Sequence, residues 1–200
     1  WCAVQGIPTA EWRDVSSAED VTAFGFPCVL KCAEGGSSLE VVLIKDAEAL
    51  QAKHAQHVLA NTGRKFVERM VEGVEVTAGV LGDTALPLIE IRPPEGKWFD
   101  YENKYSGDSA EVPFAPSLDE KTQVKVQDMA RTIHEKLGLG SYSRTDAIIT
   151  ADGAIVILEV NTPGGVGMTS ESLFPKAARA AGISFPELCE RIAQPAKVIA

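Results

Sequence analysis

Residues 144–161 have the sequence R-T-D-A-I-I-T-A-D-G-A-I-V-I-L-E-V-N, and this stretch predicts a β-hairpin. Two runs rich in Ile and Val flank Asp152-Gly153, the dipeptide that a two-residue type I′ turn prefers. A turn of that length makes Ala151 oppose Ala154 and fixes the pairing of every residue farther from the turn. The hairpin is therefore expected to bring particular side chains together at its open end.

Four polar side chains are expected at that open end, where Asp146 opposes Glu159 and Arg144 opposes Asn161. Opposed residues share one face of a sheet, with Cβ atoms about 5 Å apart, and residues two apart along a strand share it too. Neighbouring carboxylates repel each other, and burying them unpaired is costly. Carboxylates and the Asn carbonyl are hard oxygen donors that suit Mg²⁺, and the arginine beside them can bind a phosphate oxygen. The alternative is a surface hairpin that ends in an ordinary salt-bridge cluster.

A glycine-rich segment, N-T-P-G-G-V-G-M-T-S-E-S-L at residues 161–173, follows the hairpin directly. Backbone N–H groups in such a segment before a helix form an anion site. Glycine-rich turns are common, but the attachment of this one to a carboxylate hairpin favours an anionic ligand.

A second group of charged residues lies earlier in the chain. Lys31 ends an expected strand just before E-G-G-S-S at residues 34–38, a loop whose N–H and hydroxyl groups can fold over phosphates. Glu68 and Glu75 flank a turn, and either can accept a hydrogen bond from a ribose hydroxyl or an adenine amino group. Lys104, in a long loop, is a further candidate cation. Each feature has an ordinary alternative. The glycines can serve loop flexibility alone, the acids can be solvated on an edge strand, and Lys104 can be a solvated loop lysine.

Composition argues against several classes of protein. The chain has 200 residues, is 45% hydrophobic and carries a net charge of −9, which argues against polyanion binding by bulk electrostatics. No run of about 18 apolar residues is present, and the start W-C-A-V-Q-G-I-P has no feature of a signal peptide. The first residue is not Met, so we expect a piece of a longer protein. Reduced thiols are expected at Cys2, Cys28, Cys32 and Cys189, with Cys28 and Cys32 buried. His54, His57 and His134 fall in helical patterns and are expected at surface or boundary positions.

Strand and helix patterns alternate along the chain, and several strands are joined by tight turns, which predicts an α+β layout with antiparallel pieces. We expect strands over residues 26–33, 39–45, 65–71, 75–81 and 85–92, and helices over 18–24, 46–60, 118–137, 173–181 and 185–193. Ser117 and Glu120 have the spacing of a capping box. Residues 93–116 are expected to form a long loop, which is usually functional.

Taken in order, these pieces resemble the D-alanine–D-alanine ligases of the ATP-grasp superfamily. The matching stretches are V-L-K-C-A-E-G-G-S-S (29–38), F-V-E-R-M-V-E-G-V-E-V-T (66–77), F-D-Y-E-N-K-Y (99–105), S-R-T-D (143–146), L-E-V-N-T (158–162) and G-M-T-S-E-S-L-F-P-K-A-A-R-A-A-G (167–182). The resemblance implies an ATP-grasp fold, in which two α+β subdomains with mainly antiparallel sheets clasp ATP. Residues 1–70 would form the first, with the phosphate loop, and residues 71–200 the second, with the metal and acceptor site.

The resemblance also implies a cytoplasmic bacterial ligase of peptidoglycan and cell wall synthesis. ATP phosphorylates the carboxylate of one D-alanine, and the amine of a second D-alanine then displaces phosphate. Two Mg²⁺ ions, with Mn²⁺ as a substitute, are implied as cofactors. ATP and D-alanine are the implied partners, without nucleic acid or membrane, and the longer protein is a candidate homodimer.

Residue roles are implied only where this sequence matches the family motifs. Nucleotide contacts fall on Lys31, Ser37, Ser38 and Lys104 at the phosphates, on Glu68 and the backbone of Arg69 to Val71 at adenine, and on Glu75 at the ribose. Arg144 and an N–H of Gly167 would stabilise the tetrahedral intermediate, and Asp146, Glu159 and Asn161 would hold the metal ions. Ser172 and Leu173 would contact the second D-alanine. Tyr105, which can join Glu75 and Ser37 in holding the loop closed, is typical of members that select an amine.

This sequence departs from the family pattern in the phosphate loop and near the acceptor site. Glu34 and Glu40 replace a common arginine and a usual glycine, and the segment from Asn161 to Met168 is two residues longer than the usual N-T-x-P-G-M. An ATP-grasp ligase for another carboxylate and amine is therefore one alternative. The family also has an N-terminal domain that helps to hold the first D-alanine, so we expect these 200 residues alone to bind Mg-ATP without ligating. A nucleotide-binding module is the other alternative.

Overall fold

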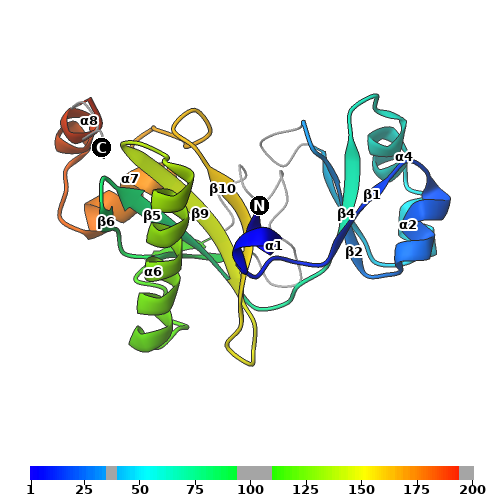
Figure 1. Cartoon of the computed structure of the whole chain (residues 1–200), viewed down its shortest axis with the longest axis horizontal. Coiled ribbons are helices and arrows are strands. Elements are labelled where there is room, and N and C mark those ends of the chain that lie inside the picture. The colour runs from blue at the N-terminus through cyan, green and yellow to red at the C-terminus, as the bar shows by residue number, and fades with distance from the viewer. Residues whose placement is uncertain (35–39, 94–109, 194–200) are drawn as a thin grey trace.

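Two mainly antiparallel sheets with helices packed on them make up the protein (Figure 1). The computed structural model describes residues 1–34, 40–93 and 110–193. The first sheet contains β1 (Trp12–Val15), β2 (Cys28–Cys32), β3 (Val41–Ile44) and β4 (Lys65–Arg69), in the order β1-β4-β2-β3. The second contains β5 (Val74–Leu81), β6 (Thr84–Ala85), β7 (Ile89–Arg92), β8 (Ala110–Pro113), β9 (Tyr142–Ile149) and β10 (Ile155–Asn161), in the order β10-β9-β5-β7-β8 with β6 beside β5. The predicted α+β class is confirmed.

One face of the first sheet is covered by α2 (Ala18–Phe24), α3 (Ala47–Leu50) and α4 (Lys53–Ala60). Cys28, Leu30 and Val67 are buried on this face, whereas Cys32, predicted to be buried, is only partly so. Figure 1 shows α2 and α4 on the side away from the second sheet. Residues of β2 and β4 that alternate with the buried ones therefore face the second sheet.

Side-chain caps begin two of the helices in this part of the chain. Ser17 and Asp46 cap α2 and α3 through their side chains. The single helix predicted over residues 46–60 is wrong, because the extended backbone of Ala52 (φ −62°, ψ 146°) ends α3 and begins α4.

Both faces of the second sheet are covered in part by helices. The helix α6 (Glu120–Leu137) lies across one face, and α7 (Leu173–Ala180) packs on the other with α8 (Phe185–Ala193) beside it (Figure 1). On β9, Ala147 and Ile149 pack under α6, and Tyr142 packs with α7. Alternation along the strand then places Arg144 and Asp146 on the α7 face. Within the described residues, no helix is both long and apolar enough to cross a membrane.

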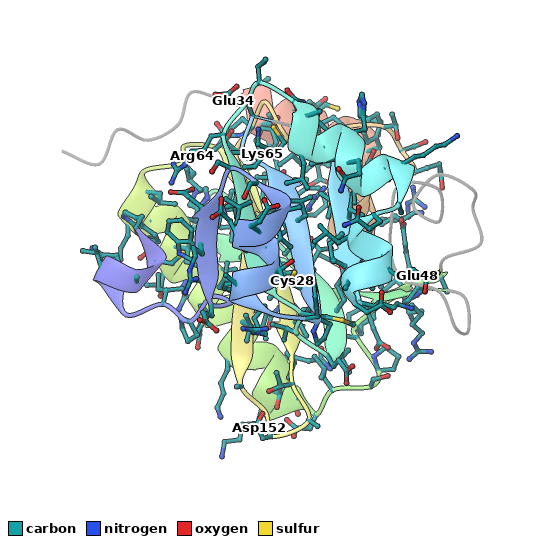
Figure 2. All side chains as sticks on the ribbon, turned by 90° about the vertical axis from the view of Figure 1, so that its right-hand side faces the viewer. Cys28, Glu34, Glu48, Arg64, Lys65 and Asp152 are labelled. Atoms are coloured by element: carbon teal, nitrogen blue, oxygen red, sulfur yellow. The ribbon has the colours of Figure 1, made fainter. Side chains whose placement is uncertain are left out.

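The β9–β10 hairpin turns through Ala151, Asp152 and Gly153, so the predicted two-residue turn is wrong. Gly153 N donates to the Thr150 carbonyl at 2.9 Å, and Gly153 has a φ of 84° that favours glycine. A three-residue loop that ends in such a residue also matches strand twist, which is why Ala151 does not oppose Ala154. Figure 2 shows Asp152 at the far tip of the hairpin.

A β-bulge restores the predicted pairing at the open end. The third turn residue by itself would bring Leu158 opposite Asp146 and turn Glu159 to the other face. The register instead shifts at Leu158, so that Glu159 pairs with Asp146 and Asn161 pairs with Arg144. The predicted pairing of these four residues is confirmed, although the turn that predicted it is not.

Ser117 does not cap α6, contrary to the prediction. Asp119 is the N-cap residue, and its Oδ1 accepts from Thr122 N at 2.7 Å. Ser117 instead donates through N and Oγ, at 3.0 and 2.7 Å, to the buried carboxylate of Glu90. Burial by itself raises the pKa of Glu90, but hydrogen bonds from Arg92 and Ser117 outweigh it and lower the pKa. Ser117 donates to a buried acid that is distant in sequence, so the local capping-box motif gave the wrong role for it.

The loop predicted over residues 93–116 contains a strand. In β8, Glu111 pairs with Ile91 of β7, which makes β8 the edge of the second sheet. The strand is only four residues long and ends in Pro113, so its sequence signal is weak.

The first residues of the chain bind the second sheet before the chain enters the first. After α1 (Cys2–Gln5), Ile7 packs into the core beneath α6. The edge of β10 is then covered, since Ile157 N donates to the Pro8 carbonyl and Thr9 Oγ1 donates to the Ile157 carbonyl, both at 2.9 Å.

The histidines differ from one another in burial. His54 and His57 are exposed as predicted, but His134 is buried, contrary to the prediction. His134 Nδ1 lies 2.8 Å from Ser143 Oγ and Nε2 lies 3.1 Å from the Gly140 carbonyl. Because a carbonyl only accepts, Nε2 carries the proton and Nδ1 accepts from the serine. Burial lowers the pKa of His134 and keeps the ring neutral.

Stability should therefore fall as the pH drops through the titration of His134. The unfolded chain takes up this proton near pH 6.5, but the folded protein does so only at lower pH, so protonation favours unfolding. Between about pH 7.5 and about pH 5, we expect the wild type to lose more free energy of unfolding than His134→Gln, by urea denaturation. His57→Gln, at an exposed position, is measured as the control. Equal pH slopes for wild type and His134→Gln would contradict this.

Strand β5 passes close beneath α7 at Gly79. A Cβ atom there would lie 2.9 Å from Phe174 Cδ2 and 3.1 Å from Leu86 Cδ1. Gly79 also pairs with Arg144 of β9. The missing side chain therefore lets α7 lie against the sheet next to the open end of the hairpin.

Gly79→Ala should lower the free energy of unfolding by about 1–3 kcal/mol, because the added methyl group overpacks this contact. Gly164→Ala is the control, since a Cβ there meets no atom of the described residues within 4 Å and the backbone has no positive φ. It should change stability by less than about 0.5 kcal/mol. Urea denaturation measures both, and equal stabilities would show that α7 moves without cost.

Candidate functional site

Four polar side chains meet at the open end of β9 and β10. Arg144 Nε and Nη2 donate to Asp146 Oδ1 and Oδ2 at 2.9 and 2.7 Å. Asn161 Nδ2 donates to Asp146 Oδ2 at 3.1 Å and to Glu159 Oε1 at 2.7 Å. Arg144 Nη2 lies 3.8 Å from Glu159 Oε1. The structure thus brings together the cluster that the sequence predicted.

The two carboxylates of the cluster have different surroundings. The Asp146 side chain is 13% exposed and accepts a further hydrogen bond, at 2.6 Å, from Thr77 Oγ1. The Glu159 side chain is 59% exposed. Asp146 is therefore held by the sheet, whereas Glu159 is open to a ligand that approaches from solvent.

Arg144 keeps its charge although its side chain is only 8% exposed. Burial by itself lowers the pKa of the guanidinium, but Asp146, Glu159 and Glu111 outweigh it and raise the pKa. Glu111 also accepts from Lys176 Nζ of α7 at 2.7 Å. The charged cluster therefore extends across the sheet to β8 and α7.

Neither Glu111 nor Lys176 was among the residues predicted from the sequence. Glu111 lies in the strand hidden within the predicted loop. Lys176 lies one helical turn after Ser172, and that spacing was the only available signal.

The glycine-rich segment leads from Asn161 to the start of α7. Ser172 is the N-cap residue of α7, and a Cβ at Gly167 would lie 2.9 Å from its Oγ. Ser172 Oγ lies 2.8 Å from Thr169 Oγ1. The Leu173 side chain is buried against the sheet, so Leu173 can offer a ligand its backbone N–H but not its side chain.

Lys31 and Glu68 form an ion pair on the face of the first sheet that its helices leave uncovered. Strand pairing puts Lys31 opposite Phe66 and Glu68 opposite Val29, which places all four on that face. The residues predicted to contact phosphate and adenine are thus neighbours, and each is the other's ionic partner.

The remaining predicted nucleotide contacts lie on β4, β5 and the link between them. Arg69 N donates to the Glu11 carbonyl at 2.8 Å, and Arg69 Nη2 donates to the Phe24 carbonyl at 3.0 Å. Its side chain therefore lies on the helix side of the sheet. Val71 is partly buried in the link, and Glu75 lies two residues before Thr77, on the same face of β5 as that threonine. Ser37, Ser38, Lys104 and Tyr105 lie outside the described residues.

A divalent cation at the open end of the hairpin would need ligands of several kinds. In the described part of the chain, no group of three or more His, Cys, Asp or Glu side chains could hold a metal ion. Two carboxylates and an amide are available in the hairpin cluster, so substrate oxygens or waters would complete the coordination.

One protein-family model matches nearly the whole chain. Residues 3–194 match the model described as D-ala D-ala ligase C-terminus. The chain belongs to this family.

Individual D-alanine–D-alanine ligases resemble the chain closely. The ligase of Nitratidesulfovibrio vulgaris is 43% identical over 193 residues, which are 96% of this chain and 60% of that ligase. The ligase of Oleidesulfovibrio alaskensis is 42% identical over 190 residues, 94% of this chain and 61% of that ligase. The chain therefore spans about 60% of the length of these relatives.

Solved structures of D-alanine–D-alanine ligase have the same fold. The Bacillus anthracis enzyme gives a TM-score of 0.79 at 29% identity, covering 97% of this chain and 64% of the enzyme. Its complex with ATP gives a TM-score of 0.76 at 25% identity, covering 97% and 62%. The ATP-grasp fold expected from the resemblance is confirmed.

Arg144→Met should lower the free energy of unfolding by roughly 3–5 kcal/mol, because it leaves the Asp146 carboxylate buried without its ionic partner. Combining it with Asp146→Asn should recover part of that loss, since no uncompensated charge then remains. Urea denaturation of the wild type, both single variants and the double variant gives the coupling energy. Strictly additive losses would contradict a buried ion pair.

Proposed function

We propose that the protein to which this chain belongs is an ATP-dependent ligase that joins two D-alanines through an acyl phosphate, for peptidoglycan precursors. The observation that carries the proposal is the cluster of Arg144, Asp146, Glu159 and Asn161 at the end of the hairpin. Membership of the D-ala D-ala ligase family supports it.

Asp146, Glu159 and Asn161 fit a Mg²⁺ site. Both carboxylates accept from one nitrogen of Asn161, so a single small cation in its place can contact both. The Asn161 amide then has to present Oδ1 instead of Nδ2, because only its oxygen can bind a cation. A pair of Mg²⁺ ions, or Mn²⁺, would neutralise the charge on the phosphates when bound. The exposure of Glu159 leaves room for the second ion and for phosphate oxygens.

Arg144 has the charge and the location to stabilise a tetrahedral intermediate. Attack of an amine on an acyl phosphate creates an oxyanion, and a desolvated guanidinium stabilises such charge strongly. The N–H of Gly167 is the second proposed donor. At the start of α7, the hydroxyl of Ser172 and the N–H of Leu173 would bind the carboxylate of the second D-alanine.

The nucleotide is proposed to lie against the uncovered face of the first sheet. Lys31 would bind its phosphates and Glu68 its adenine, so binding has to separate their ion pair. The backbone of residues 69–71 would also meet adenine, and Glu75 the ribose. Ser37, Ser38, Lys104 and Tyr105 are proposed to complete the phosphate contacts and the closure over them.

In this proposal the chain from β1 onward divides near residue 70 into a phosphate-binding subdomain and a metal- and acceptor-binding subdomain, and the residues before β1 pack on the second. The proposed use of ATP and D-alanine supports a bacterial cytoplasmic location for the reaction. A homodimer of the longer protein is part of the same proposal.

A ligase for a different amine acceptor is the second candidate. The VanG D-Ala:D-Ser ligase of Enterococcus faecalis gives a TM-score of 0.75 at 26% identity, covering 95% of this chain and 57% of that enzyme. That similarity is close to the values for the Bacillus anthracis ligase. The longer segment between Asn161 and Met168 lies at the acceptor side of the cluster and favours this candidate. Competition between D-alanine and D-serine in a product assay distinguishes the two.

Calorimetry of the 200-residue chain tests the nucleotide and metal sites together. We expect binding of ATP or ADP that depends on Mg²⁺, and we expect Glu159→Gln to abolish the Mg²⁺ dependence. Because Glu159 is exposed, this substitution should change the free energy of unfolding by less than about 0.5 kcal/mol.

Two outcomes would count against this proposal. Absence of Mg²⁺-dependent binding by the wild type at saturating nucleotide contradicts the site itself. Parallel losses of binding and stability in Glu159→Gln would support the ordinary salt-bridge cluster instead. For ligation, the longer protein with ATP, Mg²⁺ and D-alanine should form the dipeptide, detected by mass spectrometry.

A further inference from the structure

A buried hydroxyl group on β5 holds the deeper of the two carboxylates. Thr77 is 1% exposed, and its Oγ1 donates to Asp146 Oδ1 at 2.6 Å. The pairing of β5 with β9 puts Thr77 directly opposite Asp146. A bond of this length to an anionic oxygen is a strong, charge-assisted hydrogen bond.

The donors around Asp146 distinguish its two oxygens. Oδ1 accepts from Thr77 Oγ1 and Arg144 Nε, at 2.6 and 2.9 Å. Oδ2 accepts from Arg144 Nη2 and Asn161 Nδ2, at 2.7 and 3.1 Å. Asn161 Nδ2 also reaches Glu159, so Oδ2 is the oxygen on the Glu159 side. Thr77 thus binds the oxygen that a shared cation would not need.

We propose that Thr77 is a positioning residue for the metal site, whose hydroxyl fixes the rotation of the Asp146 carboxylate and presents Oδ2 to the cation. This inference rests on the proposed function, because it requires a cation between Asp146 and Glu159. Without the hydroxyl, the direction of the carboxylate toward the cation would depend on its hydrogen bonds with Arg144 and Asn161.

Arg144 holds the same carboxylate but cannot replace Thr77 during the reaction. Its proposed role draws the guanidinium toward the oxyanion of the intermediate, and that movement weakens its bonds to Asp146. Thr77 is fixed by strand pairing on both sides, with Asp146 in β9 and Ile89 in β7. A donor on a paired central strand keeps its place while the arginine engages the substrate.

Thr145 provides a matched control on the neighbouring strand. It is also 1% exposed, and its Oγ1 has no hydrogen-bond partner among the described residues. It lies next to Asp146 in β9, so its side chain is on the opposite face of the sheet. Thr145→Val therefore removes the same group at the same depth without touching the carboxylate cluster.

The experiment measures Mn²⁺ binding in the presence of ADP by electron paramagnetic resonance, with urea denaturation of each variant. Thr77→Val should raise the Kd of Mn²⁺ by about 10–100-fold, the usual effect of removing a group that orients a metal ligand. Thr77→Ser, which keeps the hydroxyl, should bind Mn²⁺ nearly as the wild type does. Thr145→Val should leave the Kd unchanged. If Thr77→Val does not fold, Thr77→Ala replaces it in the same comparison.

The outcomes separate this inference from the proposed function. A wild type that binds no Mn²⁺ with ADP overturns the proposed function and this inference with it. A wild type and a Thr77→Val variant that bind Mn²⁺ equally overturn the positioning role and leave the proposed function intact. Equal weakening by Thr77→Val and Thr145→Val also overturns it, because loss of any buried hydroxyl would then suffice.

Discussion

The bidentate ion pair between Arg144 and Asp146 is the interaction on which the site depends. Both side chains lie two residues apart on β9, a central strand, and their exposed fractions are 8% and 13%. Burying either charge without the other would destabilise the fold, because desolvation of a lone ion costs several kcal/mol. The pair forms because the strand repeat puts both side chains on one face, and neighbouring strands supply the remaining donors. Other charges of the cluster, at Glu159 and Glu111, are arranged around this neutral centre.

The sequence predicts this centre well because the hairpin signal is local. Asp152-Gly153 between two β-branched runs indicates where the strands turn, and the pairing of Asp146 with Glu159 follows from counting outward. The count gives the correct pairing because two differences from the predicted hairpin cancel. The turn is one residue longer than predicted, and the bulge at Leu158 shifts the register back by one. The run I-V-I-L is apolar at every position, so nothing in it marks which residue is bulged.

Features that depend on distant partners could not be predicted from the sequence. Ser117 has the spacing of a helix cap, yet the buried Glu90 takes its hydrogen bonds. His134 follows Ile133 on a helix with an otherwise charged surface, and only the packing of α6 against Ser143 explains its burial. The hydroxyl of Thr77 has no apparent role in a β-branched strand until the register places it opposite Asp146. In each case the local pattern was compatible with the structure, but tertiary contacts decided the role.

The bulge at Leu158 separates the hairpin into two parts with independent registers. Between the bulge and the tip, pairing follows the three-residue turn, and beyond the bulge it follows the carboxylate cluster. Gain or loss of one residue at the tip can therefore be absorbed by removing or moving the bulge, without displacing Glu159 from Asp146. Natural variation in chain length, or an inserted peptide, is best tolerated at this tip, which projects from the molecule at Asp152 (Figure 2). The hairpin thus combines a charged cluster of fixed pairing at one end with a tip whose length can vary.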